Sequence, residues 1–574
     1  MTKKEIMRRI FRYIAGEKGL TFCSFAASAV YVALTLAVPI LVGRAVGTLE
    51  TGKIGGIFPY LAVILACAGA GALCQWIMGE INNRISVRIL RDLRADAYRK
   101  LSKLPFSYLD RVPSGDTVSR IMTDAEALVD GILMGFTQLF TGVLTVVGTV
   151  VFMLTMNVTV TLVVAVLTPL SVFFARFIAR GTFRHFKKRS ELQADLTAYT
   201  EETVTGRKVV RAFGREEETY AAFAEKDEKL RRISGKAIFL SSLTNPVTRF
   251  LNALVYAAVT LVGAFLCVRG GNMTVGMLTS FLAYANQYTK PFNEISGVLA
   301  ELQNAFACAA RVFEFLDEEE ETPDPADPAE VRVTGRVGAE DVSFSYTKEQ
   351  KLIEHFSLDV RPGEHIAIVG PTGCGKTTLI NLLMRFYDVN AGRMTVEGVD
   401  VRALRRRDLR ASYGMVLQEN WIGKMSVTDN IRRGKPDATA KEVEAAARAA
   451  HAHGFISRLP QGYDTVLEEN GEGLSAGQRQ LICIAAVMLV DPPMLILDEA
   501  TASIDTRTEK KIQDAFEKLM RGRTTFIVAH RLSTIRNADK ILVMNNGSIV
   551  ESGTHEELLK KGGFYARLYN AQYA

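Results

Sequence analysis

The chain has 574 residues and a formal net charge of +7 at pH 7, so it has room for more than one domain. Its mean hydropathy of +0.11 is high for a soluble protein. Its basic residues cluster beside apolar stretches, which favours membrane topology and argues against nucleic acid as a partner. The seven cysteines have neither metal-ligand nor disulfide-framework spacing, which fits a reduced compartment or burial in lipid.

The first segment is basic and amphipathic, and it has no pattern of a cleavable signal peptide. Met7, Ile10, Phe11 and Ile14 share one face of a helix, with lysines and arginines around it. We expect this helix to lie along the cytoplasmic surface of a membrane.

Six apolar stretches follow, each long enough to cross the hydrocarbon, for which about 20 residues suffice. They are 20–46, 57–79, 130–156, 158–178, 246–268 and 275–297. This pattern predicts an all-α membrane domain with six spanning helices.

The connections between these stretches alternate in charge. Nine Lys or Arg lie between Glu80 and Leu128, whereas 156–158 holds none. Basic connections stay in the cytoplasm, so the pattern predicts a multi-pass protein with both termini and two long excursions on the cytoplasmic side. The excursions are charged and helix-rich, and we expect the spanning helices to continue into them over Ile85–Leu104 and Lys187–Phe213.

Polar side chains fall in the last two spans, where their burial in hydrocarbon is costly. Two interpretations stay open: these residues line a cavity that admits a substrate, or they pack between helices. They are Asn245, Thr248, Arg249, Asn252, Tyr284, Asn286, Gln287, Tyr288, Lys290 and Asn293.

From Asp317 to Glu330 the chain is acidic and rich in proline, so it cannot form a helix interior or a central strand. We expect a membrane domain over 1–316, a linker over 317–333 and a second domain over 334–574. Strand-like and helix-like runs alternate in the second domain, which predicts an α/β fold with a mainly parallel sheet. The strand-like runs are 340–344, 355–359, 365–369, 494–497 and 525–528.

Residues 370–377 read Gly-Pro-Thr-Gly-Cys-Gly-Lys-Thr, between a strand-like and a helix-like run. Such a loop turns backbone N–H groups toward phosphate oxygens, the lysine reaches the β- and γ-phosphates, and the hydroxyl of the last threonine ligates Mg²⁺. We therefore expect ATP and Mg²⁺ as ligands. The expected contacts are Gly370, Pro371, Thr372, Gly373, Cys374, Gly375, Lys376, Thr377 and Thr378.

The apolar run that begins at Met494 ends in two carboxylates, Asp498 and Glu499. In other phosphate-loop enzymes an aspartate at this place holds the Mg²⁺ shell. Glu499 is then placed to polarise the attacking water.

Residues 474–480 read Leu-Ser-Ala-Gly-Gln-Arg-Gln and closely resemble the signature sequence of ABC ATPases, usually Leu-Ser-Gly-Gly-Gln. The resemblance implies that Ser475, Ala476, Gly477 and Gln478 face a nucleotide held by another ATPase domain. It also implies an adenine-stacking role for Tyr346, a role for Gln418 at Mg²⁺, a loop that crosses to the partner at Asp505, and a switch histidine at His530, which contacts the γ-phosphate.

The membrane half resembles ABC exporters at its two long excursions, over 104–124 and 206–216. Nearly the whole chain is thus similar to an exporter half-transporter of a bacterial cytoplasmic membrane. This resemblance implies ATP-driven, alternating-access efflux of hydrophobic or amphipathic molecules such as drugs, lipids or peptides, and a second half-transporter as partner.

Ala476 and Ala486 depart from the family pattern, which has glycine and commonly arginine there. A methyl group at the signature restricts the backbone dihedral φ and adds bulk where backbone meets phosphate. In heterodimeric exporters of this family, one member often keeps the catalytic glutamate while its own signature is altered, and this chain resembles that member. The resemblance therefore favours a heterodimer, in which this chain supplies the catalytic glutamate, over a homodimer. Three alternatives stay open: an exporter-shaped importer of siderophore-like cargo, a homodimeric lipid flippase and an ATPase that does not transport.

Overall fold

The computed structural model describes residues 2–50, 52, 54–269, 273–347, 352–417, 420–498, 505–528 and 535–573. They form two compact units. The first consists of Met1–Ser102 and Ser114–Glu318, and the second of Lys103–Pro113 and Glu319–Ala574. The short segment before Ser114 therefore packs with the second unit, although it lies in the predicted membrane domain of 1–316.

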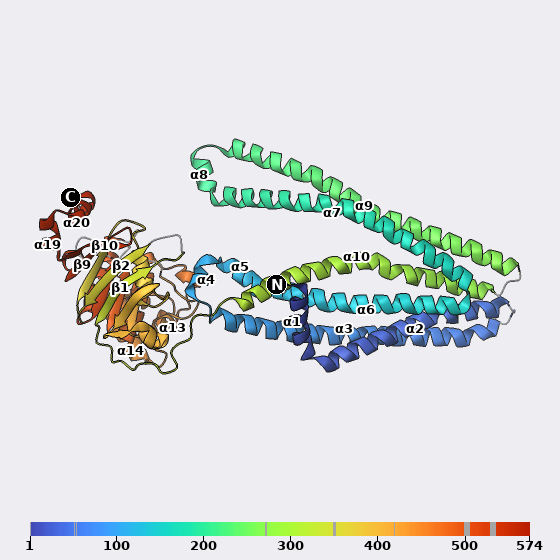
Figure 1. The fold of residues 1–574 in the computed structure, drawn as a ribbon, viewed down its shortest axis with the longest axis horizontal. Coiled ribbons are helices and arrows are strands. Elements are labelled where there is room, and N and C mark those ends of the chain that lie inside the picture. Colours follow the sequence, from blue (N-terminus) through green and yellow to red (C-terminus); the bar gives the residue numbers. More distant parts are fainter. Residues whose placement is uncertain are drawn as a thin grey trace. The chain divides into compact units, whose positions relative to one another are not determined.

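The first unit is helical (Figure 1). Its elements are α1 (Lys3–Ala15), α2 (Lys18–Glu50), the 3₁₀ turn η1 (Ile54–Gly56), α3 (Ile57–Leu101), α5 (Ser114–Ser119), the π-helical turn η2 (Arg120–Asp124), α6 (Ala125–Met156), α7 (Val158–Thr205), α8 (Arg207–Ala212), α9 (Glu216–Val268) and α10 (Val275–Asp317).

Each predicted span falls within one long helix: α2, α3, α6, α7, α9 or α10. Among the described residues, four helical stretches are long and apolar enough to cross a membrane by length and composition. These are Lys18–Glu50, Ile57–Leu101, Ser114–Met156 and Arg249–Val268. A backbone in lipid must satisfy its polar groups internally. Helical hydrogen bonds do so in these stretches, which are continuous except for the π-helical turn η2 in the third and Pro39 in the first. The total of six spans stays a prediction.

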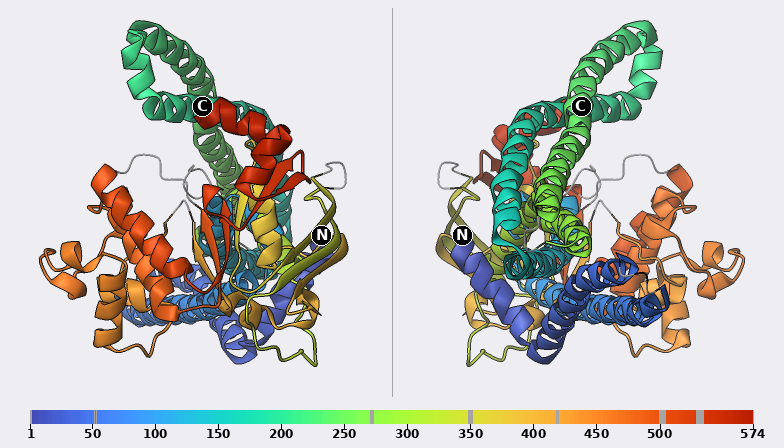
Figure 2. Two further views of the ribbon diagram at one scale, coloured as in Figure 1. Left: turned by 90° about the vertical axis from the view of Figure 1, so that its left-hand side faces the viewer. Right: turned by 90° about the vertical axis from the view of Figure 1, so that its right-hand side faces the viewer.

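Helices α7 and α9 form a long hairpin with α8 at its turn (Figures 1 and 2). Both helices extend well beyond the predicted spans 158–178 and 246–268, as expected for the second excursion. Toward α8 the hairpin diverges from α6 and α10, and no residue of α8 is buried. The apolar side chain of Phe213 at this end is 76% exposed.

Helix α1 packs on the same unit. Ile6 and Ile10 are buried in a cluster with Ile85, Leu93 and other apolar residues, whereas Phe11 is half exposed. The amphipathic face expected from the sequence therefore serves in part as a protein contact.

Helix α10 is joined to α2 around Pro39, which lies inside α2. Proline has no N–H, so the carbonyl of Thr35, four residues earlier, loses its usual helical partner. Gln287 Nε2 donates to that carbonyl at 3.2 Å. On the same side of this bond, one and two helical turns earlier along α10, Tyr284 donates to Leu36 O at 2.6 Å and Ser280 to Pro39 O at 2.8 Å.

The two helices approach so closely because both carry glycine at the crossing. A Cβ on Gly276 would lie 2.2 Å from the carbonyl oxygen of Gly43, and one on Gly43 would lie 2.4 Å from that of Gly276. Small residues are the usual means by which membrane helices come into backbone contact. We call this contact, with its three hydrogen bonds, the α2–α10 seam.

The second unit contains two sheets, and its core lies between them and the covering helices. The strands are β1 (Val337–Phe344), β2 (Ile353–Val360), β3 (His365–Val369), β4 (Ala391–Val396), β5 (Val399–Asp400), β6 (Tyr413–Val416), β7 (Met494–Asp498), β8 (Thr524–Val528), β9 (Lys540–Asn545) and β10 (Ser548–Gly553). The order is β10-β9-β3-β8-β7-β6 in one sheet and β2-β1-β4-β5 in the other.

The helices of this unit begin with α4 in the short early segment, and the others follow the strands. They are α4 (Phe106–Arg111), α11 (Lys376–Leu383), α12 (Arg406–Ala411), α13 (Val427–Arg432), α14 (Ala440–Ala449), α15 (His453–Ile456), α16 (Ala476–Val490), α17 (Thr506–Met520), α19 (His555–Lys561) and α20 (Phe564–Tyr573), with 3₁₀ turns η3 (Val401–Ala403), η4 (Gly462–Asp464) and η5 (Glu469–Gly471).

The six-stranded sheet is parallel except for β10, which confirms the expectation for the strands at 365–369, 494–497 and 525–528. The first two predicted strands instead lie in β1 and β2 of the antiparallel sheet. The connection between them is too short for the crossover of a dozen or more residues that a parallel pair requires.

The α2–α10 seam predicts a sharp difference between two glycines. Gly276→Ala should destabilise the protein by roughly 1–3 kcal/mol, because the new methyl group meets a backbone carbonyl that cannot move aside. Gly47→Ala in α2 is the matched control, since a Cβ there has nothing within 4 Å. Thermal unfolding of the purified protein in detergent measures both. Equal melting temperatures for the two variants would contradict the close approach.

Candidate nucleotide-binding site

The phosphate loop follows β3 and leads into α11, as the sequence predicts. Gly373 and Gly375 have φ of +82° and +104°, a region that favours glycine. Gly370 is required by space, because a Cβ there would lie 2.2 Å from the carbonyl oxygen of Met544 and 2.7 Å from Cys374 Sγ. The loop is therefore a preformed concave turn (the cradle), packed against β9.

Lys376 is the first residue of α11, and its side chain folds back over the loop. Nζ donates to the carbonyls of Gly370 at 2.7 Å and Pro371 at 3.0 Å. The ammonium thus lies at the mouth of the cradle, where it can exchange these carbonyls for phosphate oxygens. Pro371, Thr372 and Thr377 are exposed beside it.

Asp498 ends β7, and the sheet order places β8 between β7 and the loop-bearing β3. Parallel strands bring their carboxyl ends to one edge of a sheet. The end of β7, the end of β8 at Val528 and the phosphate loop therefore share that edge. This is the arrangement needed for Thr377 and Asp498 to hold one ion.

Tyr346 is 41% exposed and belongs to a group of aromatic rings. Its ring meets those of Phe344 and Tyr387 edge-on, with centroids 5.0 Å apart in both cases. Its hydroxyl is 3.2 Å from the Thr378 hydroxyl and accepts from Asn381 Nδ2 at 3.1 Å, so the ring is fixed beside α11. An exposed, fixed aromatic face beside a phosphate loop fits stacking on a base.

Two aromatic residues that the sequence reading missed connect this group to α4. Tyr387 donates to Asp110 Oδ2 at 2.5 Å, and Phe386 stacks on Phe106 with centroids 4.3 Å apart. Burial, and then the bond to the Asp110 carboxylate, raise the pKa of the Tyr387 hydroxyl, which therefore stays a donor. The sequence signals were the aromatic pair Phe386-Tyr387, shortly after α11, and the exporter-like segment that begins at 104.

The signature residues begin α16. Ser475 is the N-cap and forms a capping box with Gln478: the Gln478 N–H donates to Ser475 Oγ at 3.2 Å, and Ser475 N–H to Gln478 Oε1 at 2.9 Å. Ser475 is exposed, Ala476 half-buried and Gly477 buried. Because Ala476 is helical and not among the residues of positive φ, alanine fits its backbone without strain. The expectation that a methyl group at residue 476 restricts φ unfavourably is therefore wrong. Only the added bulk of the methyl group still argues for a weaker site.

Asp505 is the N-cap of α17. Its carboxylate accepts from the Thr508 N–H at 3.0 Å, and this backbone bond holds the pKa of Asp505 below its ordinary value. The residue stays charged at the end of the loop expected to reach the partner. Gln418, Glu499 and His530 lie outside the described residues, and their expected roles stay predictions.

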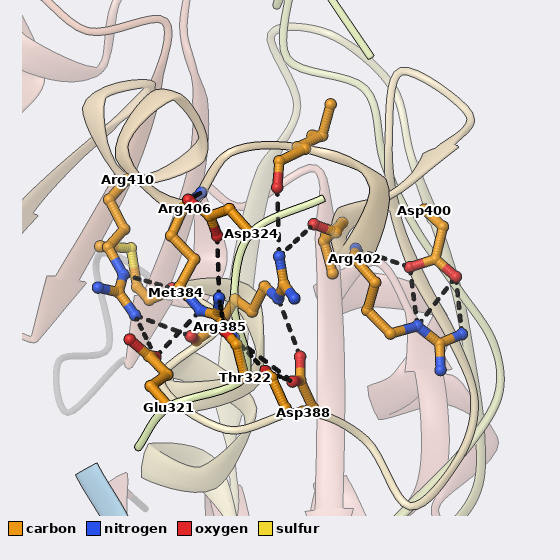
Figure 3. Close-up of polar contacts among 12 residues, drawn as sticks. Glu321, Thr322, Asp324, Met384, Arg385, Asp388, Asp400, Arg402, Arg406 and Arg410 are labelled. Carbon is orange, nitrogen blue, oxygen red and sulfur yellow. Dashed lines mark hydrogen bonds and ion pairs between the residues drawn. The ribbon is translucent and has the colours of Figure 1, made fainter. Parts of the chain in front are cut away.

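The acidic linker is not a loose tether where it enters the second unit. Figure 3 shows its residues lying beside Arg406 and Arg410 of α12 and Arg385, which follows α11. Arg406, 7% exposed, donates to Asp324 Oδ1 at 2.9 Å and to Thr322 Oγ1 at 2.6 Å, and Arg410 reaches Glu321 at 3.3 Å. The Glu321 N–H also donates to Lys103 O at 2.8 Å. Charge complementarity between 317–330 and 402–410 was the signal that could have predicted this attachment.

A cavity of about 490 Å³ lies beside α16 in the same unit. Ala486 lines it, together with Trp421, Arg433 and Cys483. The Arg433 guanidinium, just after α13, lies 4.7 Å from the Trp421 ring centroid. An arginine from another segment thus lines the same cavity as Ala486, the position where the family commonly has arginine.

Cys374 gives a direct test of the loop. Its thiol is 2% exposed and packs beneath Gly370, so a maleimide added to it cannot fit without displacing the cradle. We expect slow labelling that abolishes ATP hydrolysis and is slowed further by MgATP. Mass spectrometry of the labelled peptide with and without MgATP measures this.

The controls are Cys374→Ala, which should keep activity and become insensitive to the reagent, and Cys483→Ala, which should leave the protected fraction unchanged. Labelling of Cys374 at the same rate with and without MgATP would contradict the placement.

Comparison with known proteins agrees with both halves of the chain. The ABC transporter transmembrane region matches residues 21–292, and the ABC transporter family matches residues 353–502. The ABC transporter ATP-binding protein YfiC of Bacillus subtilis is 38% identical over 572 residues, 99% of this chain and 94% of that protein.

The fatty acid ABC transporter ATP-binding/permease protein of Mycobacterium tuberculosis is 41% identical over 511 residues, 89% of this chain and 81% of its own length. Among solved structures, a bacterial Atm1-family ABC exporter with ATP bound superposes with a TM-score of 0.77 at 28% identity, covering 98% of this chain and 99% of that one. The chain is therefore a multi-pass membrane protein of the ABC transporter family, an exporter half-transporter in which a helical membrane region is fused to an ABC ATPase domain.

Proposed function

We propose that this chain is one half of a dimeric ABC exporter that expels hydrophobic or amphipathic molecules, such as drugs, lipids or peptides, across a bacterial cytoplasmic membrane. The proposal is carried by α4. This helix connects α3 to α5 in the membrane half, yet it packs in the ATPase unit through Phe106 and Asp110. A movement of the ATPase unit is thereby passed to two membrane helices.

Adenine on Tyr346 would press on the same aromatic group. Tyr346 contacts Tyr387, and Tyr387 holds Asp110 of α4. Nucleotide binding and the position of α4 are thus linked by two side-chain contacts. ATP can drive transport only through its different affinity for two states of the assembly, and this link gives one source of that difference.

The residues present fit Mg²⁺. The ion prefers oxygen ligands and keeps much of its water. The Thr377 hydroxyl, the Asp498 carboxylate and the Gln418 amide oxygen supply such ligands, and Mg²⁺ when bound neutralises charge on the β- and γ-phosphates. We assign polarisation of the attacking water to Glu499 and contact with the γ-phosphate to His530.

Each ATP would be held between two chains. Lys376 and the loop residues 370–378 bind it from one side, and Ser475, Gly477 and Gln478 of the facing signature close on it from the other. Capping fixes the Ser475 hydroxyl at the positive end of α16, where it can meet an anion. Closure on ATP and release after hydrolysis would alternate the membrane cavity between inward- and outward-facing states, with both termini in the cytoplasm.

We favour a partner of different sequence. The Ala476 methyl group is half-buried at the first turn of α16, where it adds bulk toward the bound phosphate. Of the two ATP sites in the dimer, the one closed by this signature would be the weaker, whereas Glu499 would act in the other ATP site. The name of the mycobacterial relative, a fatty acid transporter, supports an amphipathic cargo.

The catalytic assignment predicts that Glu499→Gln lowers ATP turnover by about 100-fold or more, the usual size for losing a general base. Turnover is measured in proteoliposomes, with nucleotide binding measured in parallel. Binding should persist, because Lys376 and the loop are intact. A variant that hydrolyses ATP at a rate near wild type would remove Glu499 from the mechanism.

The assembly proposal predicts that the chain purified alone hydrolyses ATP about tenfold more slowly than the chain copurified with its partner, because a self-paired assembly would have the Ala476 signature at both sites. A tenfold difference corresponds to ~1.4 kcal/mol at the closed site. Ala476→Gly in the isolated chain should recover part of that loss. A wild-type homodimer with full turnover, unchanged by Ala476→Gly, would establish self-pairing instead.

A further inference from the structure

The membrane unit contains a cavity of about 600 Å³ between α2, α3, α6 and α10. This volume lies in the range of about 300–1,000 Å³ typical of small-molecule sites. Much of its wall is apolar, with Val32, Leu36, Met78, Leu139, Val143, Val146, Val147, Pro291 and Val298. Among its described lining residues Lys290 is the only charged one, and no carboxylate is present.

Four polar residues of the sixth span divide between the two interpretations left open by the sequence. Tyr284 and Tyr288 are 0% and 8% exposed and pack between helices. Gln287 and Lys290, one turn apart on α10, line the cavity. The side chains of Asn245, Thr248 and Asn293 lie outside the described residues.

Gln287 is fixed by the α2–α10 seam. Its Nε2 donates to the Thr35 carbonyl that Pro39 leaves open, which orients the amide. Its Oε1 is buried and has no hydrogen-bond partner among the described residues. A buried acceptor without a partner costs roughly 1–3 kcal/mol, so a turn of the Gln287 side chain that brings Oε1 to a donor in the cavity is favoured.

Lys290 has no ion-pair partner among the side chains that the structure describes. An ammonium group at membrane depth is costly unless it is paired or hydrated. The cavity therefore has both parts of a site for an amphipathic ligand. Its apolar wall can contact the hydrocarbon chain of the ligand, and its one cation can pair with a charged head group. The sign of that charge selects an anion.

We propose that this cavity binds amphipathic anions, with Lys290 pairing with the acidic head group and Gln287 Oε1 accepting from a hydroxyl or water beside it. The proposal rests on the proposed export function and names the class of its cargo. It also assigns specificity to Lys290, whereas the apolar residues that line the cavity hold any chain of suitable length.

The test uses the complete transporter in lipid nanodiscs and three probes with the same tail: dodecanoate, dodecanol and dodecyltrimethylammonium. Binding is measured directly without turnover, at a pH where the acid is ionised. The variants are Lys290→Gln and Lys290→Arg. We expect wild type to prefer dodecanoate, Lys290→Gln to weaken that binding by about tenfold (~1.4 kcal/mol) with little effect on dodecanol, and Lys290→Arg to retain it.

Equal affinity of wild type for the three probes, or an equal loss for all three in Lys290→Gln, would overturn the proposal. Glu294, four positions after Lys290, has a side chain outside the described residues, so Glu294→Gln is tested too. A melting temperature lowered by Lys290→Gln and restored by adding Glu294→Gln would assign Lys290 to a structural ion pair and overturn the proposal.

The readouts separate this proposal from the export function. Binding of dodecanoate that depends on Lys290, without ATP-driven transport of any probe, would support the site and refute export. Transport of neutral and cationic probes that is unaffected by Lys290→Gln would support export and refute the acidic cargo.

Discussion

The membrane unit depends on the close contact of α2 with α10. Pro39 removes one backbone donor from α2, and the exposed carbonyl is taken by a side chain of α10. Gly43 and Gly276 allow the backbones to approach closely enough for this exchange. In lipid, where no water can satisfy an open carbonyl, the proline and the glutamine are required together. The same contact orients Gln287 and so forms one wall of the cavity.

Close packing also determines the shape of the phosphate loop. Gly370 lies against the Met544 carbonyl and the Cys374 thiol, so the loop can curve around phosphate only because three positions lack a side chain. The parallel sheet then brings Asp498 and the end of β8 to the same edge. The phosphate loop and Asp498 are more than a hundred residues apart in sequence, and they lie at one edge of the sheet because parallel strands end together.

The ATPase unit holds two segments that are continuous in sequence with the membrane helices. The ATPase unit holds α4 by an aromatic stack and the Tyr387–Asp110 bond, and it holds the linker by Arg406 and Arg410. Arg406 is buried, and a buried arginine is costly to separate from its carboxylate partners, since their removal leaves an uncompensated charge. The ATPase unit therefore holds both segments by specific contacts, where the sequence alone indicated only a linker over 317–333.

Sequence alone was enough to predict the long apolar helices, the parallel core strands, the phosphate loop and the signature, because each depends on local periodicity or on residues a few positions apart. The tertiary structure decided the antiparallel place of β1 and β2, the attachment of α4 and the linker to the ATPase unit, and the sorting of the polar residues of α10. Tyr284 and Lys290 look alike in sequence, as polar residues in one apolar span. Only the position of α2 and α6 around that helix places Tyr284 in the packing and Lys290 in the cavity, because contacts between distant segments leave no local pattern.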